Sequence, residues 1–395
     1  MKKIFCPHVL NALELTTTGE YRACCVTTKA FQDENNEKFN VATATIDEVI
    51  KSKDRQDWIQ NFDDVFETDC RQCHEVETAG GESKRLREIN YWQTYHNIEK
   101  TNIANVIHDQ NKLEVLDLKL GNVCNLACAT CHPASSTKWN SLYKQYLGEF
   151  STLNQNWQDT DKFWDDLIKH VAHIKKIEIA GGEPFMNKKQ KRLINYLVDN
   201  DLAKNIDITW ITNSTFYEED VVDKFKYFRN VSVMISIDNT HEQFEYMRFP
   251  AKWDESYNIF LKYKKLNDNG IINLGISHTI SFLNVYRLPE FWSWAREHKV
   301  NVFNNLVMWP YCVQMLPDEF KQIVKERLES ESDPSYQNNP AVGKDNWLVK
   351  FMMQTHNISM QQQLESLKFV NSTRDGYFER AFPELVELVN KANTK

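Results

Sequence analysis

The central part of the chain alternates between short apolar runs and longer segments in which apolar residues recur at helical spacing. The short runs predict strands, and the periodic segments predict helices. Strands are expected at residues 114–120, 176–180, 206–212, 231–238, 271–280 and 300–308. The helices that connect and follow them are expected at 135–150, 160–174, 188–200, 218–228, 253–269 and 288–298.

Repeated strand–helix units predict a parallel sheet with right-handed crossover connections. Six such units are too few for a closed eight-stranded barrel. The expected fold class is therefore α/β, with a partial (β/α)6 barrel over residues 112–312. Ligands of such sheets bind at the carboxyl ends of the strands, so motifs that directly follow a strand carry the most weight.

The segments on either side of this barrel follow other patterns. Residues 1–100 are expected to form a small cysteine-rich domain, with a hairpin at 12–17 and 20–23 that turns at Gly19, and helices at 45–62 and 83–98. Residues 313–395 are expected to form a mostly helical extension, with helices at 319–328, 347–360 and 381–392 and a polar loop at 330–343.

Charge and hydropathy narrow the classes of function. The chain has 47 Lys and Arg against 55 Asp and Glu, a net charge of −8, which disfavours nucleic acid as a partner. No apolar run approaches the ~20 residues that span a bilayer. The N-terminal sequence MKKIFCPHVL lacks the apolar segment of a signal peptide. The sequence thus predicts a cytoplasmic protein that does not enter a membrane.

Cysteine is the most informative residue type. The chain has nine cysteines, and eight of them lie within the first 131 residues. An odd number in a chain without an export signal argues against a disulfide framework, and the clustering argues for metal binding.

The first cysteine group follows the first predicted barrel strand. Cys124, Cys128 and Cys131 form a C-x3-C-x2-C motif there. Three thiolates can hold three irons of a [4Fe–4S] cubane and leave the fourth iron open. The alternative is a structural zinc site with His132 as the fourth ligand. The position at a strand end favours the cluster.

A glycine-rich motif follows the second strand, and with the cysteines it resembles the radical S-adenosylmethionine (SAM) superfamily. This motif is Gly181-Gly182-Glu183-Pro184. The resemblance implies that the cluster binds SAM and cleaves it reductively, and that the resulting 5′-deoxyadenosyl radical abstracts hydrogen from a substrate. It also implies that the glycine-rich backbone approaches the amino group of SAM, as only residues without Cβ allow.

The same resemblance implies further SAM contacts. Asn213, Ser236 and Asp238 follow or end later strands and are implied to bind SAM, while Arg248 is implied to pair with its carboxylate. Helix caps, turns or a surface charge are the alternatives for these residues. Thr130 departs from the family pattern, which has an aromatic residue just before the third cysteine.

The second cysteine group lies in the N-terminal domain. Cys6, Gly19 and Cys24 form C-x12-G-x4-C, and Cys70 and Cys73 follow as C-x2-C. Four thiolates can close a second [4Fe–4S] cluster or a zinc site, and the spacing alone does not choose. The pattern resembles the auxiliary-cluster domains called SPASM and, in the shorter one-cluster form, twitch. The cysteine number fits an N-terminal twitch domain, in which Cys25 is the alternative to Cys24 and the cluster is expected to transfer electrons.

The sequence as a whole predicts a radical SAM enzyme that acts on a peptide or protein, with a flavodoxin or ferredoxin as electron donor. Radical modification of a small nucleotide or metabolite is the alternative. A non-catalytic iron–sulfur or zinc-binding sensor or scaffold is the competing class. Cys312 is a candidate hydrogen-atom donor, against the alternative of a buried apolar residue.

Overall fold

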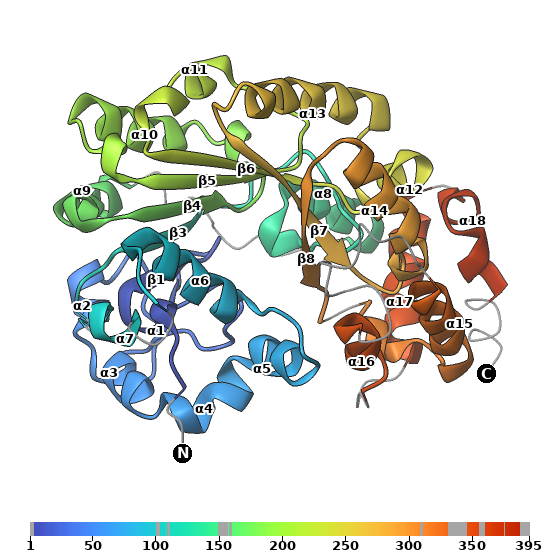
Figure 1. Ribbon diagram of the computed structural model, residues 1–395, viewed down its shortest axis with the longest axis horizontal. Helices are drawn as coiled ribbons and strands as arrows, with labels where there is room; N and C mark the ends of the chain where they lie inside the picture. The colour runs from blue at the N-terminus through green and yellow to red at the C-terminus, as the bar shows by residue number, and fades with distance from the viewer. Residues whose placement is uncertain are drawn as a thin grey trace. The chain divides into compact units, whose positions relative to one another are not determined.

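The computed structural model describes residues 4–99, 103–107, 109, 111–148, 157, 160–308, 311–330, 346–354, 360–374 and 376–387. The chain divides into two compact units (Figure 1). The first comprises residues 1–124, 151–211 and 218–232, and the second comprises 125–150, 212–217 and 233–395. The predicted division at 100, 112 and 313 stays a prediction.

The strands of the first unit are mostly parallel. They are β1 (Ala12–Leu15), β2 (Tyr21–Arg22), β3 (Val115–Lys119), β4 (Lys176–Ala180) and β5 (Asp207–Thr212), in the order β2-β1-β3-β4-β5. β1, β3, β4 and β5 pair in parallel, and β2 pairs antiparallel with β1. The predicted N-terminal hairpin is confirmed, and β1 extends the sheet of the predicted barrel strands, which the sequence did not indicate.

The two faces of this sheet are covered by different helices. On one face, Trp210 of β5 donates a hydrogen bond through Nε1 to Gln190 Oε1 of α10 at 2.8 Å. The opposite face is covered by α6, whose Ile89 and Trp92 pack on Ala12 of β1 and Val115 of β3. The N-terminal strand β1 therefore contributes to the sheet face that α6 covers.

The helices predicted at 83–98, 160–174 and 188–200 are confirmed, those predicted at 45–62 and 218–228 differ, and four further helices of the first unit, α1, α4, α5 and α7, were not predicted. The helices of this unit are α1 (Pro7–Asn11), α2 (Ile46–Ile50), α3 (Lys53–Gln60), α4 (Phe62–Asp69), α5 (Arg71–Thr78), α6 (Lys84–His96), α7 (Ile103–Val106), α9 (Asp161–His170), α10 (Lys189–Asp199) and α11 (Glu219–Val222). The helix predicted at 45–62 is interrupted because Ser52 caps a new helix by accepting a hydrogen bond from the Arg55 N–H. The helix predicted at 218–228 is α11 followed by a 3₁₀ turn at Phe225–Tyr227.

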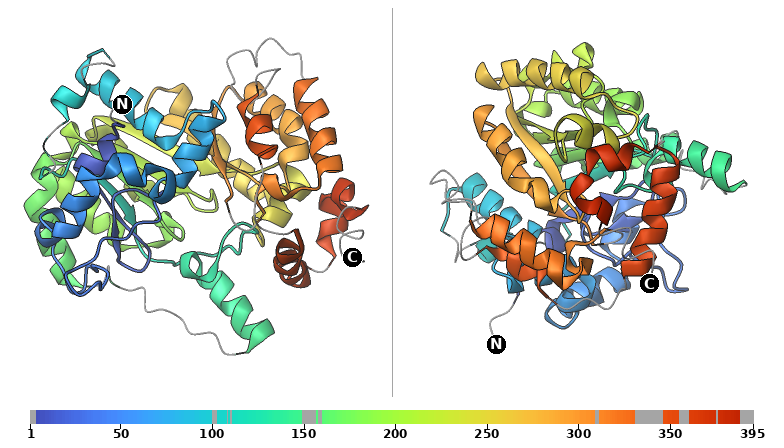
Figure 2. Two further views of the ribbon diagram at one scale, coloured as in Figure 1. Left: turned by 90° about the horizontal axis from the view of Figure 1, so that it is seen from below. Right: turned by 90° about the vertical axis from the view of Figure 1, so that its right-hand side faces the viewer.

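The second unit holds the remaining strands and the C-terminal helices. β6 (Asn230–Ser236) begins in the first unit, and β7 (Asn273–Ile280) pairs in parallel with β8 (Asn301–Leu306). The helices before the tail are α8 (Thr137–Leu147), α12 (His241–Met247), α13 (Trp253–Asp268) and α14 (Leu288–Glu297). α13 packs on β7 and α14 on β8 (Figure 2). All six strands predicted between residues 114 and 308 are thus confirmed.

The C-terminal tail is helical, as predicted. Its helices are α15 (Asp318–Glu329), α16 (Trp347–Met352), α17 (Met360–Ser372) and α18 (Tyr377–Ala381). The helix predicted at 347–360 ends earlier, at Met352. Residues 383–387 are also helical, whereas 388–392 and the loop predicted after residue 330 lie outside the described residues. No helix within the described ranges is both long and apolar enough to cross a membrane.

Candidate active site

The predicted cluster motif begins shortly after β3. Cys124 is the last residue of the first unit, and Cys128 and Cys131 lie in the second. Cys124 and Cys128 are buried, and Cys131 is half-buried. His132, the alternative fourth ligand, is exposed, and its Nε2 lies 3.5 Å from Ser135 Oγ.

Gly181 and Gly182 lie against the backbone that leads to Cys124. Both have positive φ, 83° and 52°. A Cβ on Gly182 would lie 2.3 Å from Val123 O, and one on Gly181 would lie 2.8 Å from Lys119 Cα. The Glu183 N–H also donates to Val123 O at 2.8 Å. Both glycines are therefore required for the end of β4 to lie against this loop, whereas the implied approach to SAM stays a prediction.

The rest of the glycine-rich motif forms a short turn. Glu183 is fully buried, and its carboxylate accepts a hydrogen bond from the Phe185 N–H at 3.1 Å. Pro184 opens the 3₁₀ turn Pro184–Met186. Glu183 therefore caps the N-terminus of this turn, as acidic residues at this position commonly do.

The segment that follows α12 holds the backbone around Cys128. The Ala127 N–H donates to Phe249 O at 2.7 Å, and the Ala129 N–H donates to Met247 O at 2.8 Å. One hydrogen bond on each side of Cys128 leaves its φ and ψ little freedom, and so fixes the direction of its Cα–Cβ bond.

Helix α8 holds the same loop from another direction. Ser136, the N-cap of α8, donates its hydroxyl to Leu126 O at 2.5 Å and accepts from the Trp139 N–H. The Trp139 indole donates to Cys128 O at 2.9 Å. The carbonyl of Cys128 is therefore satisfied from within the second unit.

The C-terminal tail contributes a third attachment through a buried arginine. Arg374, which is 3% exposed, donates to Ala127 O at 2.5 Å and to Tyr246 O at 2.9 Å. Its guanidinium also lies over the rings of Tyr246 and Trp139, at 5.2 and 5.5 Å from their centroids. The turn that follows helix α17 therefore positions the cysteine loop.

A buried ion pair lies directly beside Cys128. Arg248 Nη2 lies 2.8 Å from Asp238 Oδ2, and Arg248 Nη1 donates to Cys128 Sγ at 3.8 Å. Burial raises the pKa of the Cys128 thiol, and the charges of Arg248 and Arg374 oppose that rise. Burial also opposes the charge of Arg248, but Asp238 and Cys128 outweigh it and raise the arginine pKa above its ordinary value.

Asp238 is held in place by its neighbours. The Thr279 N–H donates to its carboxylate at 2.9 Å, and Asn284 Nδ2 donates to its backbone carbonyl at 2.9 Å. His278 Nε2 lies 3.2 Å from the same carbonyl. Asp238 therefore orients Arg248 in this conformation, and a direct contact of either residue with SAM stays a prediction.

Asn213 holds the cysteine loop as well. Its amide donates to Asn125 Oδ1 at 3.0 Å, and its own oxygen accepts from the Thr215 N–H at 3.0 Å. Ser236 is buried at the end of β6. Asn213 thus contacts the cysteine motif through Asn125. The sequence did not point to Asn125.

Cys312 is fully buried at the start of a 3₁₀ turn. Its thiol lies 3.5 Å from Gln314 Oε1, to which it donates. This environment agrees with the apolar alternative, and a catalytic role for Cys312 stays a prediction.

The N-terminal cysteines line one pocket. Its cysteines are Cys6, Cys24, Cys70 and Cys73, and Cys25 is not among the lining residues. Burial, with the other thiols adding to it, raises the pKa of Cys6 and Cys70 to about 12. Within the described part of the chain, no three His, Cys, Asp or Glu side chains are close enough together to hold a single metal ion.

The cysteine motif and the strands around it are similar to a known family. Residues 118–286 match the Radical SAM superfamily model. This part of the chain is therefore similar to radical SAM domains. The donor set fits the group that this similarity implies, because buried cysteines with a guanidinium against one sulfur suit an anionic cluster held by thiolates.

Comparisons over longer stretches give more distant similarities. A probable GTP 3′,8-cyclase of Methanocaldococcus jannaschii is 23% identical over 188 residues, which are 47% of this chain and 56% of that protein. The chain thus spans little more than half the length of this curated relative.

Two solved structures are also similar at low identity. Native anSMEcpe with bound AdoMet is 13% identical with a TM-score of 0.40, over 58% of this chain and 63% of that chain. Streptococcus suis SuiB bound to precursor peptide SuiA is 13% identical with a TM-score of 0.36, over 80% and 66% of the two chains.

Sequence reasoning missed several residues that position the cysteine motif. Arg374 lies 247 residues after the carbonyl that it holds, and nothing in its local sequence indicates this contact. Ser136 was recognisable, because serine before a predicted helix is a preferred N-cap.

Proposed function

We propose that the chain is a radical SAM enzyme that binds one [4Fe–4S] cluster through Cys124, Cys128 and Cys131. When bound, this cluster would supply reductive cleavage of SAM to a radical that abstracts hydrogen from the substrate. The observation that carries the proposal is the buried contact of Arg248 with Cys128, inside the segment that matches the family model. A guanidinium at a buried sulfur favours the thiolate, which is the form that binds iron.

The protein's own residues hold this centre in place. Arg374 and Trp139 fix the carbonyls of Ala127 and Cys128, and Asp238 orients Arg248. Gly181, Gly182, Glu183, Pro184, Asn213, Ser236, Asp238 and Arg248 remain our candidates for the surroundings of SAM.

The test is anaerobic reconstitution with iron and sulfide, followed by SAM and dithionite. We expect 5′-deoxyadenosine from the unmodified protein and none from Cys128→Ala. Thr130→Ala is the matched control, because it alters the same loop without removing a thiol, and it should retain SAM cleavage. If the unmodified protein binds iron at this motif but forms no 5′-deoxyadenosine, the non-catalytic sensor or scaffold is the better explanation.

We further propose that Cys6, Cys24, Cys70 and Cys73 hold an auxiliary [4Fe–4S] cluster, as in a twitch domain, that transfers electrons. Their position around one pocket supports this. A structural zinc ion held by the same four thiolates is the alternative.

The substrate we propose is a peptide or protein, since many enzymes that this chain resembles modify peptides, and the electron donor is a flavodoxin- or ferredoxin-like protein. A small nucleotide is the second candidate, because the distant relative carries the name of a GTP cyclase. Incubating the reduced enzyme with GTP and with the products of neighbouring genes, and detecting mass changes, distinguishes the two.

A further inference from the structure

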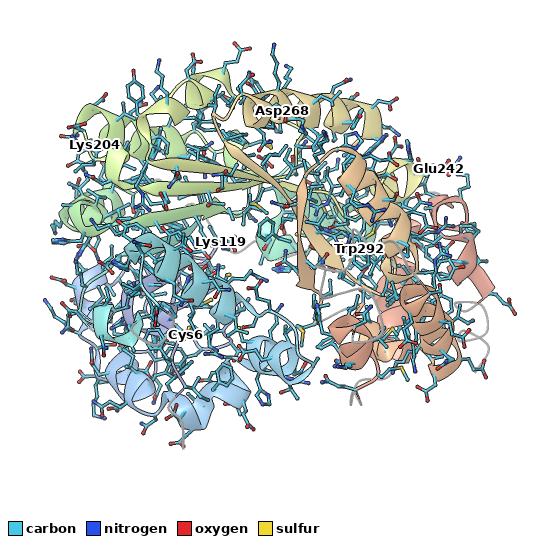
Figure 3. The ribbon with its side chains drawn as sticks, viewed as in Figure 1. Cys6, Lys119, Lys204, Glu242, Asp268 and Trp292 are labelled. Carbon is cyan, nitrogen blue, oxygen red and sulfur yellow. The ribbon has the colours of Figure 1, made fainter. Side chains whose placement is uncertain are left out.

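Arg85 of α6 contacts two of the three segments that carry the N-terminal cysteines. Cys6 directly precedes α1 (Figure 3), Cys24 follows β2, and Cys70 and Cys73 lie at the start of α5. Arg85 lines the pocket that these four cysteines share. It is not a ligand in either of the proposed cluster sites.

The first contact holds the backbone beside Cys6. Arg85 Nη1 donates a hydrogen bond to Phe5 O at 2.7 Å, and Phe5 directly precedes Cys6 on the chain. In the same way, Arg374 donates to Ala127 O, the carbonyl directly before Cys128. Arg85 therefore restrains the backbone from which the Cys6 thiol extends.

The second contact attaches the guanidinium to α5. Arg85 Nε donates to Glu77 Oε1 at 2.9 Å, and Nη2 pairs with Glu77 Oε2. Glu77 lies four residues after Cys73, on the same face of α5. The guanidinium also lies 5.5 Å from the ring centroid of Phe66, which lines the pocket. A bidentate pair fixes the plane of a guanidinium, so Arg85 connects the Cys6 segment to the helix that carries Cys73.

The ion pair presents its positive end to the pocket. Arg85 is among the residues that line the pocket, and Glu77 is not. Lys84 also lines it, but its charge is divided between two carboxylates, because Lys84 Nζ lies 2.9 Å from Glu178 Oε2 and 3.9 Å from Glu88 Oε1. The charge of Arg85 is balanced as well, but by a carboxylate outside the lining.

The charge of Arg85 acts on the thiols of this pocket. Burial raises the pKa of the Cys73 thiol; the Arg85 backbone N–H and the Arg85 charge oppose that rise, and Glu77 adds to it. Burial also raises the pKa of the Cys70 thiol, and the Arg85 charge opposes this rise too. A cation that stabilises the negative form of two thiols also stabilises an anionic group that they hold.

We infer that Arg85 is the positioning residue of the N-terminal cysteine site and that it raises the reduction potential of the cluster bound there. The inference rests on the proposed auxiliary cluster. One-electron reduction makes a cluster held by four thiolates more negative, and net charge is one of the factors that set its potential. A cation that faces the cluster therefore stabilises the reduced state more than the oxidised state.

The test is a redox titration of the auxiliary cluster, followed by EPR spectroscopy of the reduced state. The full-length protein carries Cys124→Ala, Cys128→Ala and Cys131→Ala, so that the signal belongs to the N-terminal site. In this background, Arg85→Met should lower the midpoint potential, because Glu77 loses its cation. We expect at least a tenfold change in the ratio of reduced to oxidised cluster, which is about 59 mV for one electron. Arg85→Lys, which keeps the charge, should recover half of this shift or more.

Glu77→Gln separates the charge from the attachment. The glutamine still accepts a hydrogen bond from Arg85 but no longer balances its charge, so the midpoint potential should rise. A purely structural role predicts lower iron content in Arg85→Met and Glu77→Gln, without potentials that shift in opposite directions. Arg87→Met is the matched control, because Arg87 also lies on α6 but donates to Glu82 O at 3.2 Å and is not in the pocket lining. It should leave the potential unchanged.

The outcomes separate this inference from the proposed cluster. An unchanged potential in Arg85→Met, or shifts of the same sign in Arg85→Met and Glu77→Gln, overturns the inference and leaves the auxiliary cluster in place. If Arg85→Met assembles no cluster, Glu77→Gln decides alone, and only a raised potential supports the inference. Zinc in place of iron at these cysteines, measured by elemental analysis of anaerobically prepared protein, overturns the proposed cluster and the inference with it.

Discussion

Arg248 lies between Asp238 and Cys128, within 2.8 Å of the carboxylate and 3.8 Å of the sulfur. All three side chains are buried. The arginine therefore links the Asp238 carboxylate, just after β6, to the Cys128 sulfur. A change in either group alters the environment of the other.

Removing this arginine should destabilise the protein. We expect Arg248→Met to lower the free energy of unfolding by about 3–5 kcal/mol, because Asp238 is left as an unpaired buried charge. Adding Asp238→Asn should recover part of the loss. Urea unfolding measures both. Lys252→Met, which removes an exposed partner of Glu245, is the control and should cost about 1 kcal/mol or less. Equal stability of the single and double variants would contradict this account.

Loss of Arg374 should impair SAM cleavage at the C-x3-C-x2-C motif and leave the N-terminal cysteine site intact. We expect Arg374→Met to slow 5′-deoxyadenosine formation at least tenfold, because it frees the carbonyl of Ala127 from its buried donor. Iron at the N-terminal cysteines should be unchanged. Arg380→Met, at an exposed position on α18, is the matched control. A variant with full SAM cleavage would show that Arg374 does not position the loop.

The close approach at Gly182 should be intolerant of a methyl group. We expect Gly182→Ala to lower the unfolding free energy by about 1–3 kcal/mol more than Gly270→Ala. Both glycines have positive φ, but a Cβ at Gly270 meets nothing within 4 Å, whereas one at Gly182 would meet Val123 O. The pair therefore separates the contact from the backbone conformation. Equal losses in chemical denaturation would mean that the contact with Val123 does not matter.

The two cysteine groups should bind iron independently. The unmodified protein should hold about eight irons per chain, the content of two [4Fe–4S] clusters. Cys70→Ala should lose about half of them and still cleave SAM. Loss of all iron in this variant would show that the two sites are not separate.

Adjacent cysteines allow a sharper comparison. Cys24→Ala should lose the same iron as Cys70→Ala, because Cys24 lines the N-terminal pocket. Cys25→Ala should retain it, because Cys25 is not among the residues that line this pocket. Iron and sulfide analysis of the two variants decides, and the opposite result would exchange the roles of the two cysteines.

The strands and helices whose signal lies in a short stretch of sequence could be predicted from it. Strands such as Lys176–Ala180 were placed correctly because a short apolar run between turn residues is a local signal. The break at Ser52 was missed, although residues 51–57 contain no apolar residue and a serine N-cap was present. Both are local signals of a helix boundary.

Contacts that depend on tertiary pairing could not be predicted from the sequence. Glu14, Asp117 and Glu178 lie side by side across the sheet because β1 pairs with β3, and β3 with β4, in one particular register. A shift of one residue would turn each of these side chains to the other face. The pairing of Arg248 with Asp238 was not predicted either, because both residues were assigned to SAM.

The hydrogen bond from Arg374 to Ala127 also sets an order of events during synthesis. A growing chain exposes the cysteine motif 247 residues before the arginine that fastens it is made. Until this arginine emerges, the nascent polypeptide holds the motif only through α8 and the segment after α12. Insertion of iron and sulfide into the fully fastened loop is expected only after the turn that follows α17 has emerged and folded back.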